Sequence, residues 1–119
     1  MTSAPLPTIE PCSDEGLEHH AHQPRSDGTI RAAAVLFSAL GDPSRLRIME
    51  LLYDGAHCVG DLAGELNEGM SSVSQRLKQL NLARLVSRER VGKHIYYRLA
   101  DDHVRELLES VFEHVDEDH

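Results

Sequence analysis

The spacing of hydrophobic residues changes twice along this chain of 119 residues. Apolar side chains recur every three or four positions between residues 30 and 80, alternate with polar ones between residues 85 and 99, and return to helical spacing between residues 102 and 117. Helices and strands repeat every 3.6 and 2 residues, so the pattern predicts helices, then a β-hairpin, then a last helix. We therefore expect a mainly α fold with one small β-hairpin that turns at residues 91–93.

Capping and turn residues divide the first helical part into four segments. Asp42 can cap the second segment, and Pro43 suits the first position of a helix. Gly41, Gly55 and Gly69 stand at the expected breaks. The four expected helices cover residues 30–40, 43–53, 59–66 and 71–80. The positions expected to face inward are Ala33, Ala34, Phe37, Leu40, Leu46, Met49, Leu52, Tyr53, Leu62, Ala63, Leu66, Val73, Leu77 and Leu80.

Length and composition indicate one domain preceded by an arm. A chain of this length with 40% hydrophobic residues can bury one core. Residues 1–28 hold four of the five prolines and show no hydrophobic period, so we assign them to a flexible arm and residues 29–119 to the folded domain. No signal peptide or membrane-spanning stretch is recognised, and two cysteines are too few for a disulfide framework. We expect a cytoplasmic protein with reduced thiols.

The charge of the chain is strongly uneven. The formal net charge of −8 argues against binding to nucleic acid when it is taken as an average. Residues 71–98, however, hold seven basic residues and one acid, a local net charge of +6. Residues 101–118 hold eight acids and one arginine. The first of these segments suits a polyanion and the second suits cations.

Residues 59–80 predict two short helices joined by a turn that contains Gly69, which is the pattern of a helix-turn-helix. A reading helix needs polar side chains that reach base edges and phosphates while its other face stays in the core. Each charge alone would also suit a solvated surface, but a basic helix-turn-helix followed directly by a basic hairpin favours double-stranded operator DNA. The residues expected to contact it are Ser71, Ser72, Ser74, Gln75, Arg76, Lys78, Arg88, Arg90, Lys93 and His94.

Four motifs in the expected domain stand out, namely DPSRLRI at 42–48, CVGDLA at 58–63, SVSQRL at 72–77 and GKHIYY at 92–97. Together they resemble the ArsR/SmtB family of metal-sensing repressors. The resemblance runs from about residue 30 to the C-terminus. It implies a homodimeric winged helix-turn-helix repressor that binds its operator when metal-free and releases it when metal binds. Members commonly carry His and then Gln after the Val-Ser pair, where this chain has Gln75 and Arg76, so the operator sequence stays open.

Two pairs of metal-ligand side chains stand near the two ends of the last expected helix. Asp101 and His103 lie at its start, and His114 and Glu117 lie near its end. His103 and His114 are 11 residues apart, so they share a face but lie about 16 Å apart along one helix, too far to bind one ion. Two antiparallel copies of the helix in a dimer would bring one pair beside the other. The apolar stripe that would form the seam is Val104, Leu108, Val111 and Val115.

These four residues taken alone fit surface histidines on an acidic helix better than they fit a metal site. The resemblance reverses that interpretation, because Asp-x-His followed after ten residues by His-x-x-Glu is similar to the zinc site on the C-terminal helix in the family. It implies that Asp101, His103, His114 and Glu117 hold zinc or a related ion such as cadmium, cobalt or lead.

A second candidate site involves Cys58 and Asp61 at the start of the third helix. Arm residues would complete it, and these are Cys12, His19, His20 and His22. The arrangement resembles the other sensing site of the family, in which a thiolate favours softer ions such as cadmium or lead. Cys58 is equally well explained as a small buried residue. A third possibility is a thiol-redox repressor in which Cys12 and Cys58 form a disulfide.

An enzyme is the remaining alternative. The chain shows no nucleophile paired with a base and no reason for an open metal coordination position. We therefore expect a regulator with no small organic substrate and no membrane partner.

Overall fold

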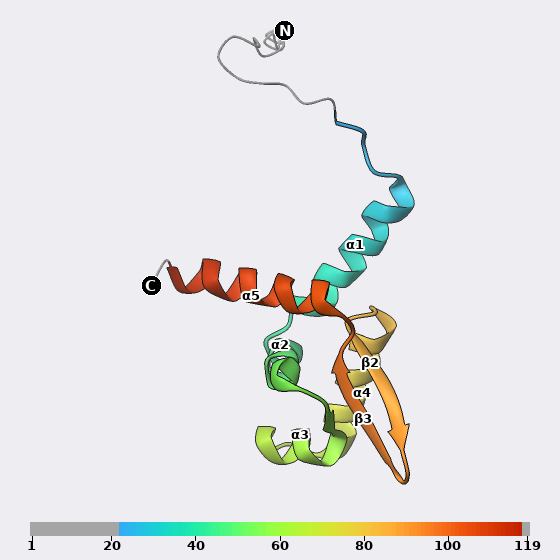
Figure 1. Ribbon diagram of the computed structural model, residues 1–119, viewed down its shortest axis with the longest axis vertical. Coiled ribbons are helices and arrows are strands. Elements are labelled where there is room, and N and C mark those ends of the chain that lie inside the picture. The colour runs from blue at the N-terminus through green and yellow to red at the C-terminus, as the bar shows by residue number, and fades with distance from the viewer. Residues whose placement is uncertain (1–21, 118–119) are drawn as a thin grey trace, which may run out of the picture.

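The computed structural model describes residues 22–117. Cys12, His19 and His20 of the expected arm lie outside the described residues. Among the residues described, no helix is long and apolar enough to cross a membrane. In chain order the elements are α1 (Asp27–Leu40), α2 (Pro43–Leu51), the 3-10 helix η1 (Leu52–Asp54), β1 (His57–Cys58), α3 (Val59–Leu66), α4 (Met70–Leu82), β2 (Val86–Val91), β3 (His94–Leu99) and α5 (Asp102–Glu117) (Figure 1).

The fold is mainly α with a small antiparallel sheet, and the predicted fold class is confirmed. The predicted bounds of the third and last helices match the structure. α1 starts three residues earlier than expected, because the Ser26 hydroxyl accepts a hydrogen bond from the Thr29 amide at 3.1 Å and caps the helix. Asp27 and Gly28 thus belong to α1 and not to the expected arm. Asp42 caps α2 as predicted, accepting from the Arg45 amide at 2.9 Å.

The inward face of α1 differs from the prediction. Phe37 is 59% exposed and Ala34 is exposed, whereas Leu36 and Ala39 pack against the core beside the buried Leu40. The predicted face was chosen from spacing alone, and two registers of apolar residues along this helix satisfy that spacing. A large apolar surface of α1 therefore stays outside the core of the chain.

The sheet has three strands in the order β1-β3-β2, all antiparallel. The predicted hairpin is present, but its turn has two residues, Gly92 and Lys93, with Val91 paired to His94 in the ladder. Gly92 has φ +64°, a left-handed conformation that glycine adopts without a steric penalty. β1 was not predicted, since a strand of two residues is too short to show an alternating pattern.

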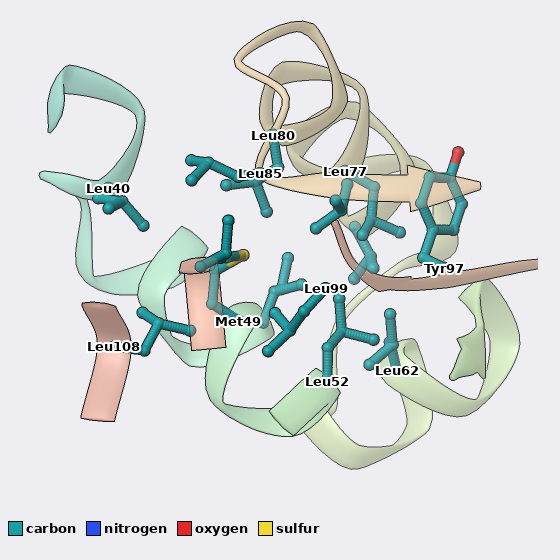
Figure 2. Packing of buried hydrophobic residues seen from close by; sticks show 14 of the residues in the cluster. Leu40, Met49, Leu52, Leu62, Leu77, Leu80, Leu85, Tyr97, Leu99 and Leu108 are labelled. Carbon is teal, nitrogen blue, oxygen red and sulfur yellow. The ribbon is translucent and has the colours of Figure 1, made fainter. Parts of the chain in front are cut away.

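The core joins the helix-turn-helix to the helices and strands around it (Figure 2). Val73, Leu77 and Leu80 of α4 are fully buried, as predicted. They meet Met49 from α2 and Leu62 from α3, with leucines of the sheet region and of α5 closing the cluster. Ile48 is fully buried as well, although it lies outside the predicted face of its helix. α4, the expected reading helix, is thus held mainly by apolar packing, which has no preferred direction.

α1 and α5 lie at the opposite end of the molecule from α3 and the tip of the hairpin (Figure 1). Val104 and Leu108 of α5 are buried in the core of their own chain, whereas Val111 and Val115 are 41% and 48% exposed. Of the four residues predicted to form a dimer seam, only Val111 and Val115 are therefore exposed enough to contact a second copy. Ile30 and Phe37 of α1 add exposed apolar surface at the same end.

Replacing Leu77 with Ala should destabilise the fold by about 2–5 kcal/mol, because it opens a cavity in the fully buried side of α4. Met70→Ala is the matched control, since Met70 begins the same helix and is 58% exposed, and should change stability by less than about 0.5 kcal/mol. Chemical denaturation of both variants measures the difference. Equal destabilisation would contradict the packing of α4 described above.

Candidate DNA interface and metal ligands

α4 separates its polar and apolar residues onto opposite sides. Ser71, Ser72, Ser74, Gln75 and Lys78 are exposed, while the buried side faces the core. Gly69 precedes the helix without a side-chain cap. The outward side is therefore open to a ligand along most of its length, as a reading helix requires.

The turn before α4 is built differently from the sequence expectation. Asn67, and not Gly69, ends α3 in a left-handed conformation with φ 55°, which asparagine tolerates better than most residues. Glu68 follows and forms an ion pair with Arg76 of α4. Arg76 is half-buried and already paired, so Glu68 holds one of its terminal nitrogens before DNA binds. The sequence shows no sign of this pair, because its partners are eight residues apart across a turn.

The register of the hairpin divides its basic residues between two faces. Arg88 lies opposite Tyr97 and Arg90 opposite Ile95, so both arginines share the face that continues into the buried Tyr97 and packs against the helices. Glu89 and Arg98 lie on the other face, where they form an ion pair at 2.7 Å.

His94 also lies on the face of Glu89, because it stands opposite Val91. Its ring contacts Tyr96 edge-on, with 6.4 Å between the ring centroids. Lys93 is exposed in the turn. The expected wing residues thus divide into Arg88 and Arg90 on the helix side, Lys93 at the tip and His94 on the far side.

The four expected ligands at the ends of α5 are all exposed, and the side chain of His103 is 94% exposed. Asp101 also caps α5, because its Oδ1 atom accepts a hydrogen bond from the Val104 amide at 3.0 Å. His103 Nδ1 lies 3.9 Å from the same oxygen. A carboxylate that caps with one oxygen keeps the other for a metal. The donor set of two imidazoles and two carboxylates suits zinc.

The ligand pairs at the two ends of α5 do not meet within one chain. Over residues 22–117, no three His, Cys, Asp or Glu side chains gather into a metal cluster. His103 and His114 stand 11 residues apart on one helix, about 16 Å along its axis, so they cannot share one ion within a chain.

The second candidate site is only partly within the described residues. Cys58 is half-buried at the N-cap position of α3, and Asp61 is exposed in the first turn of that helix. His22 is exposed ahead of α1. In addition, Cys58 pairs with Tyr96 across the sheet, a placement that the sequence did not reveal.

α5 is fixed to the body by a polar contact that sequence reasoning missed. The Tyr53 hydroxyl donates to Glu109 at 3.0 Å, and Arg105 lies 4.8 Å over the Tyr53 ring while donating to its backbone oxygen. The hydrogen bond to the Glu109 carboxylate, with some loss of solvation, raises the pKa of Tyr53 above its usual value. The helix that carries the candidate ligands is thereby held in a defined orientation.

Comparison with known proteins agrees with this arrangement. The sequence profile described as "Bacterial regulatory protein, arsR family" matches residues 42–88. A transcriptional repressor SmtB homolog of Synechocystis sp. is 48% identical over 84 residues, which span 71% of this chain and 64% of that protein, just under two thirds of its length. A cadmium resistance transcriptional regulatory protein CadC homolog of Staphylococcus aureus is 34% identical over 68% of each chain.

The fold has solved counterparts. The homodimeric winged helix-turn-helix DNA-binding domain of a Mycobacterium bovis protein superposes with a TM-score of 0.76 at 28% identity, covering 83% of this chain and 92% of that one. Helices α3 and α4 with the hairpin therefore define a winged helix-turn-helix regulator. The chain belongs to the ArsR family of bacterial regulatory proteins, whose members regulate transcription and are not enzymes.

The division of the hairpin leads to a test with a matched pair of arginines. Arg88→Ala should weaken binding to any duplex and reduce the slope of log K against log salt concentration by about one, because we expect Arg88 to contact a phosphate. Arg98→Ala removes the same charge from the opposite face, where Glu89 already neutralises it, and should change neither quantity. Fluorescence anisotropy over a salt series measures both. Equal losses would show that the face assignment is wrong.

Proposed function

We propose that this protein is a metal-responsive transcriptional repressor that binds operator DNA as a homodimer in the cytoplasm and releases it when zinc or a related divalent ion binds between its C-terminal helices. The observation that carries the proposal is the placement of two exposed ligand pairs at opposite ends of α5. Neither pair completes a tetrahedral site alone. An antiparallel partner would supply the missing half of each site.

The exposed apolar surface supports pairing at this end of the molecule. Ile30 and Phe37 of α1 and Val111 and Val115 of α5 are each more than two fifths exposed in the single chain. Burying such side chains against a second copy would contribute about 25 cal/mol per Å² of apolar area. The homodimeric state of the similar Mycobacterium bovis domain agrees with this proposal.

The chain's own residues suggest how metal and DNA would be linked. A dimer binds two half-sites about 34 Å apart only if its two α4 helices present that spacing. When bound, the ion would supply a cross-link between Asp101 and His103 of one subunit and His114 and Glu117 of the other. Metal affects DNA affinity only if the cross-linked arrangement and the DNA-competent arrangement differ. α5 is held against the rest of its subunit through Tyr53. A change in how two α5 helices pair would therefore also change how the two subunits, with their α4 helices, are placed relative to each other.

His114→Gln should still dimerise and bind DNA, but zinc should no longer release it, whereas zinc should weaken DNA binding by the parent protein by about 5–150-fold. Glu113→Gln is the matched control, since it alters the adjacent exposed position without removing an expected ligand. Anisotropy titrations with and without zinc measure both. Release that survives in His114→Gln would move regulation away from α5.

Mixed dimers test whether the site is shared. When His114→Gln is combined with a chain carrying Asp101→Ala and His103→Ala, one of the two sites regains all four ligands and the other keeps only Glu117. We expect one strong zinc site per mixed dimer by equilibrium dialysis, and none in either parental homodimer. Absence of strong zinc binding in verified mixed dimers would contradict a site between subunits.

The second candidate is a soft-metal or thiol-redox sensor at Cys58. It is favoured by the half-buried Cys58 beside the exposed Asp61, and cadmium resistance is part of the name of the CadC homolog. Regulation by cadmium, lead or oxidant that is lost in Cys58→Ser and unchanged in His114→Gln would select this candidate.

A further inference from the structure

Arg45 of α2 forms hydrogen bonds to two other helices. Its Nε atom donates to the Ala39 carbonyl at 2.6 Å and one terminal nitrogen donates to the Ser38 carbonyl at 3.3 Å, both in the last turn of α1. The other terminal nitrogen donates to Gln79 Oε1 of α4 at 3.0 Å. Arg45 itself stands in the first turn of α2, where its amide is capped by Asp42. One guanidinium therefore joins α1, α2 and α4.

The bonds to α1 add to the capping of its C-terminus. The last carbonyls of a helix have no partners within it and carry partial negative charge. The Gly41 amide donates to the Ser38 carbonyl at 3.2 Å, but the last turn of α1 contains no basic residue, so Arg45 supplies the cation from the next helix. Leu40 is the buried residue of α1, and Leu36 and Ala39 pack partly against the core. Arg45 therefore adds a directional contact to the apolar packing that holds α1 on the body.

The bond to Gln79 fixes α4. Val73, Leu77 and Leu80 hold α4 by apolar contacts, which tolerate small rotations of a helix about its axis. A hydrogen bond with a defined direction restricts such a rotation. Gln79 lies one turn after Gln75, on the exposed side that carries the expected DNA contacts. Arg45 and Gln79 also line the same surface hollow as Gln75 and Arg76.

We propose that Arg45 is a positioning residue that couples the orientation of α1 to that of the reading helix through Gln79. The inference rests on the proposed function, in which α1 and α5 form the pairing surface and α4 reads DNA. A rearrangement of α1 in the dimer would reach α4 through this guanidinium, without passing through the apolar core. Lysine cannot replace it, because only the planar guanidinium bonds two helices at fixed angles.

Gln79→Leu, Arg45→Lys and the double variant test the coupling in metal-free protein. The probes are the duplex that the parent protein selects from a randomised library and a scrambled duplex of the same length. Each single variant should bind the selected duplex about 5- to 10-fold more weakly, which corresponds to the net contribution of one intramolecular hydrogen bond. Affinity for the scrambled duplex and the salt dependence should stay unchanged, because no phosphate contact is removed.

The double variant should bind no more weakly than Arg45→Lys alone, because both substitutions break the same link. Arg47→Lys is the matched control, since Arg47 lies on the same helix and its ion pair is with Glu50 of that helix. It should bind like the parent. Gln79 is exposed, so Gln79→Leu keeps the test valid even if Arg45→Lys fails to fold.

Three results would overturn the coupling: unchanged affinity in Gln79→Leu, losses that multiply in the double variant, or equal losses on both duplexes. The last result would assign Arg45 and Gln79 to direct phosphate contact. Failure of the proposed function is distinguishable, since it would appear as a parent protein that selects no preferred duplex, or as one that zinc does not release.

Discussion

The burial of one side of α4 is the constraint on which the rest of the structure depends. Val73, Leu77 and Leu80 are removed from water, and every other element contributes to covering them or to holding what covers them. Burial on this side forces the serines, glutamines and lysine onto the opposite side. The same packing that stabilises the domain therefore exposes the surface that we propose reads DNA. Directional polar contacts, such as those of Arg45 and Tyr53, then fix what apolar packing leaves adjustable.

Sequence reasoning predicted the elements with clear periodicity and missed those set by single contacts. α3, α4 and α5 have repeated apolar positions, so their existence could be predicted directly, and so could the inward residues of α4. The apolar stripe of α5 was predicted as a dimer seam, whereas its first half, Val104 and Leu108, is buried in the core of its own chain. β1 has two residues and depends on pairing with β3, which no local pattern encodes. The prediction that Phe37 faces the core was wrong. α1 has apolar residues on two sides, and both sides satisfy helical spacing although only one packs against the core.

The candidate sites show the same division. The exposure of Ser71, Gln75 and Lys78 follows from helical geometry and was expected. The pairing of Arg76 with Glu68 and the division of the hairpin's basic residues between its two faces depend on a turn and on a strand register, which the sequence does not fix. The candidate ligands at the two ends of α5 were proposed because their spacing resembles the zinc site of the family, but the capping role of Asp101 is visible only in the structure. Local geometry is thus predictable from periodicity, whereas contacts between elements are not.

The short strand β1 has a consequence for signalling. It places Cys58 in direct pairing with Tyr96 of the hairpin, so an event at that thiol acts first on the wing. α5, which carries the candidate metal ligands, lies with α1 at the opposite end of the molecule from α3 and the tip of the hairpin (Figure 1). A signal at Cys58 would reach the wing first, whereas a metal ion bound at α5 would first change how two copies of the chain pair. One small domain could therefore let two different chemical signals act on DNA binding by separate routes.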